Sequence, residues 1–122
     1  MPRTLIAVVD DMFFVSKIQA TAKALGVIVR FPRTLDAARE AASEETPDLV
    51  VVDLHNQKLS PLELARKFKT DERLQNIPLL GFFSHVQVEL QKQAVEAGYD
   101  QIVPRSVFAR DLADILAGSS KT

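Results

Sequence analysis

The sequence predicts an α/β domain with a five-stranded parallel sheet and five helices that cover both of its faces. Short apolar runs without polar alternation, which are typical of strands buried on both faces, alternate along the chain with segments of helical periodicity. Right-handed connections between such strands place helices on both sides of a parallel sheet. Hydrophobic residues make up 47% of the chain and charged residues 25%, which is the composition of a folded globular protein.

Length and charge limit the class of protein further. A chain of 122 residues suits one domain, which we expect at residues 1–118, followed by a flexible tail at 119–122. The 15 Lys and Arg residues are balanced by 16 Asp and Glu residues, so the basic excess typical of nucleic-acid-binding domains is missing. We therefore expect no direct nucleic-acid partner.

The absence of two sequence features indicates the compartment. Cysteine does not occur, which excludes disulfides and thiolate metal sites and is compatible with a reducing cytoplasm. No apolar run approaches the roughly 18 residues of a membrane helix, and the N-terminus lacks the layout of a signal peptide. We therefore expect a cytoplasmic protein with no membrane partner.

The first strand and the first helix occupy the start of the chain. The apolar run 5–9 ends abruptly at two aspartates, as a buried strand does where it reaches the edge of its sheet. Phe14, Ile18 and Ala22 then recur at helical spacing and predict a helix. Gly26 suits the left-handed position at which many helices end.

The second and third strands flank a helix with a recognisable cap. Residues 27–29 form the second strand, and Thr34 can cap the helix that follows it. The third strand, 49–52, runs directly into a carboxylate, like the first. Ser60 and Pro61 fit the cap and the first residue of the third helix.

The last two strands are predicted at 79–83 and 102–103. The helix between them begins its apolar face at Val86 and ends at Gly98. One final helix is predicted by apolar residues at helical spacing, namely Phe108, Leu112 and Ile115.

Three carboxylates follow two of these strands. Asp10 and Asp11 close the first strand and Asp53 closes the third, and in open parallel sheets the binding crevice lies beyond the carboxyl ends of the strands. Neighbouring strands lie about 4.8 Å apart, so the carboxylates would converge. At about 4 Å, each like-charge pair costs about 4 kcal/mol at an effective dielectric constant near 20. Mg²⁺ offsets this repulsion, because it prefers oxygen ligands and keeps waters that a phosphate can replace.

The sequence VVDD at 8–11 and the sequence VVD at 51–53 together resemble the receiver domain of bacterial two-component response regulators, the CheY-like fold. The resemblance extends to residues 76–78 and 98–100 and covers about residues 3–118. It implies the strand order 2-1-3-4-5, which is shared with flavodoxin-like folds. It also implies a role in phosphorelay signal transduction, with a sensor histidine kinase or a phosphotransfer protein as partner.

The resemblance also implies a role for each residue of the acidic site. Asp53 would be the phosphoacceptor that forms an acyl phosphate, and the reaction would be phosphoryl transfer catalysed by positioning and charge neutralisation. Asp11 and Asp53 would bind Mg²⁺ directly, Asp10 through a water and His55 through its backbone carbonyl. An effector domain or a target protein would bind the face made by the fourth helix, the fifth strand and the fifth helix.

The chain departs from the receiver pattern in the residues that respond to phosphorylation. Receivers have a hydroxyl residue at the end of the fourth strand, where this chain has Phe83, with Ser84 as a substitute hydroxyl one residue later. Arg105 replaces the lysine that contacts the phosphate. The arginine keeps the positive charge, but its planar guanidinium differs in shape from a compact ammonium. Ser106 replaces the following proline, so we expect no cis peptide there. Ile102 replaces the aromatic residue of the fifth strand.

Two hypotheses of function follow from these matches and departures. The three carboxylates favour a phosphorylatable receiver, whereas Phe83 and Ile102 favour a pseudo-receiver that docks proteins independently of phosphorylation. Binding of FMN is disfavoured, because the acidic pair after the first strand would repel its phosphate. We expect no stand-alone enzyme, because a phosphatase of the haloacid dehalogenase type needs an acid where His55 stands. We interpret His55 and His85 as loop residues rather than as ligands of a transition metal.

Overall fold

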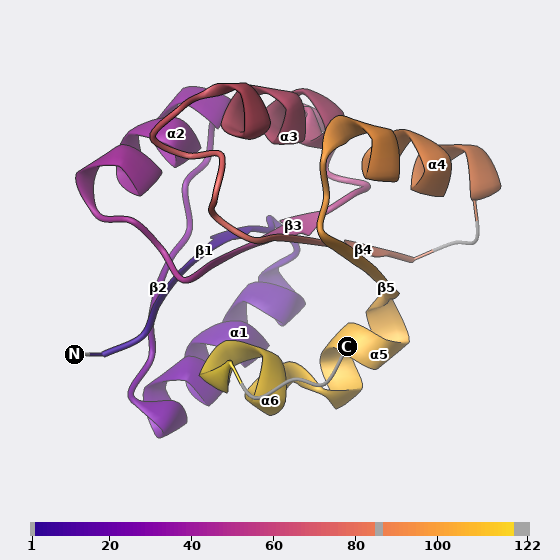
Figure 1. Ribbon diagram of the computed structural model, residues 1–122. Helices are drawn as coiled ribbons and strands as arrows, with labels where there is room; N and C mark the ends of the chain where they lie inside the picture. The colour runs from indigo at the N-terminus through magenta and orange to yellow at the C-terminus, as the bar shows by residue number, and fades with distance from the viewer. Residues whose placement is uncertain (1, 85–86, 119–122) are drawn as a thin grey trace.

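The computed structural model describes residues 2–84 and 87–118. Within them lies one five-stranded parallel sheet, in the order β2-β1-β3-β4-β5 that the resemblance implied. Figure 1 shows this sheet as the middle layer of the molecule, with helices above and below it. The strands are β1 (Thr4–Val8), β2 (Ile28–Arg30), β3 (Leu49–Asp53), β4 (Leu79–Phe83) and β5 (Gln101–Pro104).

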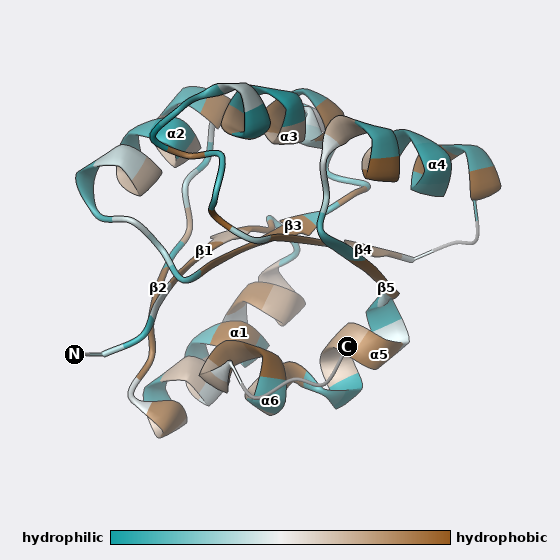
Figure 2. Cartoon of the chain, viewed as in Figure 1, coloured by the Kyte–Doolittle hydropathy of each residue, from teal (hydrophilic) through white to brown (hydrophobic). Residues whose placement is uncertain are grey.

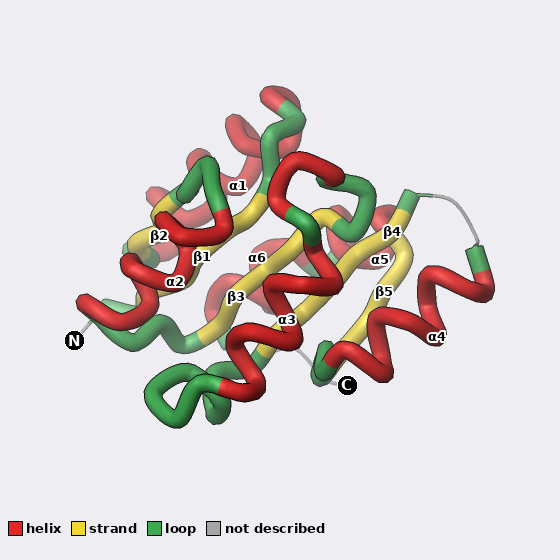
Figure 3. Tube along the Cα trace, turned by 90° about the horizontal axis from the view of Figure 1, so that it is seen from above, coloured by secondary structure: helices red, strands yellow, loops and turns green. Residues whose placement is uncertain are grey.

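The helices form two layers, which Figure 3 shows from above and Figure 1 from the side. In the described ranges, no helix combines the length and the apolar character that crossing a membrane requires. A short 3-10 helix, η1 (Gln57–Leu59), connects β3 to the upper layer. The upper layer consists of α2 (Leu35–Glu44), α3 (Pro61–Thr70) and α4 (Val88–Ala97), and the lower layer of α1 (Met12–Leu25), α5 (Arg105–Arg110) and α6 (Leu112–Ala117).

The hydrophobic core is divided between the two faces of the sheet. Figure 2 shows the apolar strands between helices whose polar residues face outward. Because side chains alternate along a strand, Phe82 packs into the lower layer and Phe83 into the upper one. In the lower layer Phe82 is stacked on Phe108 with 4.6 Å between ring centroids, and the ring of Phe14 meets both edge-on at 5.3 Å.

Most of the predicted helix ends are confirmed. Gly26 ends α1 with φ of 70° and Gly98 ends α4 with φ of 119°, a left-handed conformation that glycine adopts without strain. The hydroxyl of Thr34 accepts a hydrogen bond from the N–H of Ala37 at 3.0 Å and caps α2. The predicted positions of Ser60 and Pro61, at the cap and the first residue of α3, are confirmed. Ser60 precedes α3, but its own left-handed conformation, φ 44°, leaves its side chain without a capping hydrogen bond.

The end of the chain differs from the prediction of a single last helix. Residue Asp111, with φ −100° and ψ 15°, separates α5 from α6, so six α-helices lie in the described ranges instead of five. The bend lets Phe108 pack beside Phe82 while Leu112 and Ile115 stay buried in the same layer. The predicted tail at 119–122 and the predicted helix residue Val86 lie outside the described residues.

Tyr99, in the turn between α4 and β5, joins two elements of the upper layer. Its side chain is 5% exposed, and its hydroxyl donates a hydrogen bond of 2.7 Å to the carbonyl oxygen of Pro61, the first residue of α3. Burial raises the pKa of the Tyr99 phenol well above its ordinary value. Beside it, the carboxylate of Asp100 accepts from the ammonium of Lys69 at 2.9 Å and from the N–H of Leu79 at 2.8 Å.

Replacing Phe82 with alanine tests the lower core. The ring of Phe82 is fully buried, so Phe82→Ala should lower the free energy of unfolding by about 3–5 kcal/mol in urea denaturation. Val95 on α4 is 63% exposed, and Val95→Ala should change it by less than about 0.5 kcal/mol. Similar losses in the two variants would contradict this description of the core.

Candidate functional site at the carboxyl end of the sheet

The register of the sheet brings the acidic residues to one edge. Val8, the last residue of β1, is paired with Val52 of β3, so the residues that follow the two strands emerge side by side. Asp10 is exposed, whereas Asp53, at the end of β3, is only 9% exposed. Asp53 is in turn paired with Phe82 of β4. The predicted convergence of the carboxyl ends of these strands is therefore present in the structure.

Asp53 is a buried carboxylate with a fixed orientation. Its Oδ1 accepts a hydrogen bond of 2.9 Å from the backbone N–H of His55. Burial raises the pKa of Asp53, and the hydrogen bond from the His55 N–H and the positive charge of Arg105 oppose that increase. The negative charge of Asp10 acts in the same direction as burial. This poorly solvated oxygen group is suited to attack an electrophile.

Asp11 has partners at both of its carboxylate oxygens. Oδ1 accepts from the N–H of Phe14 at 3.3 Å and caps α1. Oδ2 accepts from Nη2 of Arg105 at 2.9 Å, in an ion pair in which both side chains are about one third exposed. The hydrogen bond from Arg105 is the main reason why the pKa of Asp11 is lowered, and the Phe14 N–H adds to it.

Arg105 is held from two sides. Besides its ion pair with Asp11, its guanidinium carbon Cζ lies 4.6 Å from the centre of the Phe14 ring, a cation–π contact. Phe14 packs against Phe82 and Phe108 in the lower core. Arg105 therefore contacts a residue of the hydrophobic core at the edge of the sheet. The sequence predicted a phosphate contact for Arg105, but the contact with Asp11 and Phe14 was not predicted.

The residues fit a magnesium ion by their chemistry but are not preassembled around one. Within residues 2–84 and 87–118, no three His, Cys, Asp or Glu side chains form an arrangement ready to hold a metal ion. Both carboxylate oxygens of Asp11 are instead used within the protein, by Arg105 and by the start of α1. Three carboxylates at neighbouring strand ends are nevertheless the oxygen donors that Mg²⁺ prefers. Mg²⁺ and Arg105 would therefore compete for Asp11.

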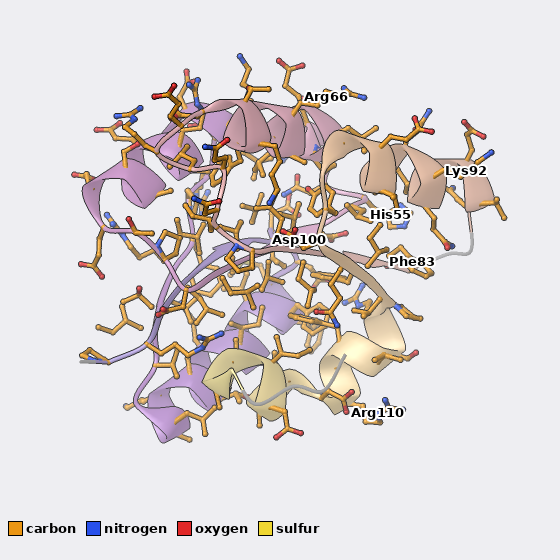
Figure 4. All side chains as sticks on the ribbon, in the orientation of Figure 1. His55, Arg66, Phe83, Lys92, Asp100 and Arg110 are labelled. Atoms are coloured by element: carbon orange, nitrogen blue, oxygen red, sulfur yellow. The ribbon has the colours of Figure 1, made fainter. Side chains whose placement is uncertain are left out.

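Phe83 occupies the position at which receivers have a hydroxyl residue. Phe83 is 9% exposed and is part of the upper core, against which Ile102 of β5 also packs. Ser84 is exposed at the start of the loop after β4. Figure 4 shows Phe83 and His55 at the same end of the sheet. His85 lies outside the described residues, so the interpretation of that histidine stays a prediction.

No protein-family model and no curated protein matches the sequence. A response regulator from Hahella chejuensis has a TM-score of 0.83 at 15% identity, with 98% of this chain and 99% of that chain covered. A CheY-like receiver domain protein from Methanospirillum hungatei JF-1 has a TM-score of 0.80 at 17% identity, with 97% and 93% covered. The chain has the receiver-domain fold.

One further structural neighbour is a receiver domain whose structure contains a magnesium ion. The receiver domain of a sensor histidine kinase from Pseudomonas aeruginosa PAO1 has a TM-score of 0.81 at 17% identity, with 97% of each chain covered. That structure is described as having a magnesium ion coordinated in its active-site cleft. At these low identities the likeness is one of fold alone.

Replacing Asp53 with asparagine tests its burial. Asp53→Asn removes a buried charge but keeps an oxygen for the His55 N–H, so it should raise the free energy of unfolding near neutral pH in metal-free buffer. A raised native pKa means that protonation stabilises the wild type below the ordinary carboxyl pKa, and this stability is lost as the pH rises through the raised value. The advantage of the variant should therefore shrink towards about pH 4.

Urea unfolding of both proteins across this pH range measures the difference. Asp36→Asn, at an exposed position of α2, is the matched control and should show no such pH-dependent gain. An advantage of Asp53→Asn that stays constant down to acid pH would contradict the role assigned to burial.

Proposed function

We propose that this chain is the receiver of a two-component phosphorelay and accepts a phosphoryl group on Asp53. The observation that carries the proposal is a buried, oriented carboxylate at the carboxyl end of β3, on which the charges of Arg105 and Asp10 act. The donor is a sensor histidine kinase or a phosphotransfer protein. The receiver folds of the structural neighbours support this role for a cytoplasmic signalling module that is not a stand-alone enzyme.

The transfer uses Asp53 as the nucleophile. A carboxylate oxygen attacks the phosphorus, the bond between phosphorus and the donor breaks, and an acyl phosphate forms. The hydrogen bond from the His55 N–H keeps the carboxylate in one orientation, which reduces the entropy lost in reaching the transition state. The positive charge of Arg105 already lowers the pKa of Asp53. Once Arg105 leaves Asp11, its guanidinium can bind the phosphoryl oxygens.

A magnesium ion belongs to this proposal. Asp10, Asp11 and Asp53 would hold it with their carboxylates and His55 with its backbone carbonyl. When bound, the ion supplies positive charge that neutralises the transferred phosphoryl group. Phe83 has no hydroxyl to bind that group, and Ser84, exposed in the next loop, is the substitute in the sequence.

The output surface is also part of the proposal. The face formed by α4, β5 and α5 would bind an effector domain or a target protein. Val88 and Val95 on α4 support this assignment, because they are 68% and 63% exposed although they are apolar.

Phosphorylation can be measured directly by mass. Incubation with acetyl phosphate and Mg²⁺ should add one phosphoryl group to the intact wild-type chain and none to Asp53→Asn. The exposed Asp36 of α2 provides a matched control, since Asp36→Asn should be labelled like the wild type. A wild type that stays unlabelled under conditions that label an ordinary receiver would instead support the phosphorylation-independent docking module.

Replacing Arg105 should change metal binding and phosphoryl-mimic binding in opposite directions. Arg105→Met frees Asp11, so Mg²⁺ should bind more tightly, by about ten-fold if the ion pair contributes about 1.4 kcal/mol. Beryllofluoride should bind about ten-fold more weakly, because a charge-assisted contact is lost.

Isothermal titration calorimetry measures both affinities. Arg110→Met is the control, because Arg110 is an exposed arginine of the same helix that pairs with Asp111 and lies away from the acidic site. It removes the same charge and should leave both affinities within about two-fold of the wild type. Parallel effects of the two variants would mean that only net charge matters.

A further inference from the structure

A pocket of about 560 Å³ opens beside the acidic site. It lies between the first half of α1, the segment after β2 and the η1 turn after β3. This volume falls within the roughly 300–1,000 Å³ of sites that hold small molecules. Asp10 lines both this pocket and the acidic site, whereas the other carboxylates of that site do not line it.

Two cations at the pocket have no partner within the protein. Arg33 and Lys58 line it and are exposed, and in the described part of the chain neither makes an ion pair or a hydrogen bond. The single carboxylate of Asp10 leaves the pocket with a net positive charge. An anionic group, above all a phosphate that both side chains can contact, complements this charge.

Part of the pocket lining is apolar and partly uncovered. Met12 is 69% exposed, an unusual position for a large apolar side chain, and Phe31 and Pro32 continue the wall. A thioether, an aromatic ring and a proline in one pocket offer apolar surface against which a flat ring can lie. A ligand ring would remove this apolar surface from water.

Asn56 adds a polar group that the fold does not use. Its side chain is 5% exposed, and neither Oδ1 nor Nδ2 has a hydrogen-bond partner among the described residues. Its backbone N–H donates to the carbonyl oxygen of Asp53, so the turn does not depend on the side chain. A buried amide without partners destabilises the protein. Its donor and acceptor, side by side, match the edge of a nucleobase such as adenine.

We propose that this pocket binds a purine nucleoside monophosphate. The phosphate lies at Arg33 and Lys58, the base lies against Met12 and Phe31, and the amide of Asn56 turns towards the edge of the base. Because that amide lies beneath the pocket surface, it reaches the base by rotation about its own side-chain bonds. The proposal is independent of phosphoryl transfer to Asp53.

The test is a titration of the full chain, followed by the backbone amide signals in NMR spectra. The three probes are AMP, adenosine, which lacks the phosphate, and ribose 5-phosphate, which lacks the base. AMP should give saturable shifts centred on the pocket, and each of the other two should bind at least about ten-fold more weakly. Absence of saturable shifts with AMP, or equal binding of ribose 5-phosphate, would overturn the proposal.

Two double variants at the surface distinguish binding in the pocket from a general electrostatic effect of the protein's charge. The double variant Arg33→Gln, Lys58→Gln should weaken AMP binding by at least about ten-fold, and these exposed positions do not endanger folding. The double variant Arg66→Gln, Lys92→Gln removes the same charge from α3 and α4, where Figure 4 shows both side chains far from the core. It should bind AMP like the wild type, and an equal loss in both variants would overturn the proposal.

Asn56→Leu distinguishes a binding group from a structural one. Because the amide has no partners to lose, the variant should be at least as stable as the wild type in urea unfolding. It should nevertheless bind AMP about ten-fold more weakly. Unchanged AMP affinity, or a loss of stability that shows the amide to be structural, would overturn the role of Asn56 and with it the proposed ligand.

Discussion

The ion pair between Arg105 and Asp11 is the interaction on which the charged edge of this sheet depends. Parallel pairing of β1 and β3 places Asp10, Asp11 and Asp53 at the same edge, and no rearrangement of loops can separate strands held in register. Arg105 brings a positive charge to this edge, where it binds Asp11. That arginine is held in place by Phe14, and Phe14 by the aromatic core of the lower layer. The charge distribution of the site and the packing of the hydrophobic core are therefore coupled.

Features set by neighbours in sequence were predictable. The inner strands β1, β3 and β4 were recognisable because a strand covered on both faces is apolar along most of its length. The edge strands β2 and β5, which include Arg30 and Gln101, gave only short apolar runs. Thr34 and Gly26 marked helix ends because capping is local. The break at Asp111 could not be predicted. Phe108 and Leu112 are four residues apart, which fits one continuous helix, and both are buried in the lower core although Asp111 interrupts the helix between them.

The candidate site was predictable to the extent that strand ends determine it. The carboxylates follow apolar runs, so their common edge followed from topology alone. The pairing of Arg105 with Asp11 joins opposite ends of the chain and depends on side-chain conformations, which no local pattern encodes. The one available signal was Phe14, three residues after Asp11 and thus on the same side of the first helical turn. Asn56 gave no signal, because asparagine is common in turns for local reasons.

The single tyrosine gives this protein a built-in optical probe. The sequence contains no tryptophan, so Tyr99 accounts for the near-ultraviolet signal other than that of phenylalanine. Its hydroxyl donates to the carbonyl oxygen of Pro61 in a buried position, so its absorbance and fluorescence report on the contact between the start of α3 and the turn before β5. Since burial raises its pKa, the native phenol resists ionisation in alkali. The appearance of tyrosinate absorbance at high pH would mark the moment at which that contact opens.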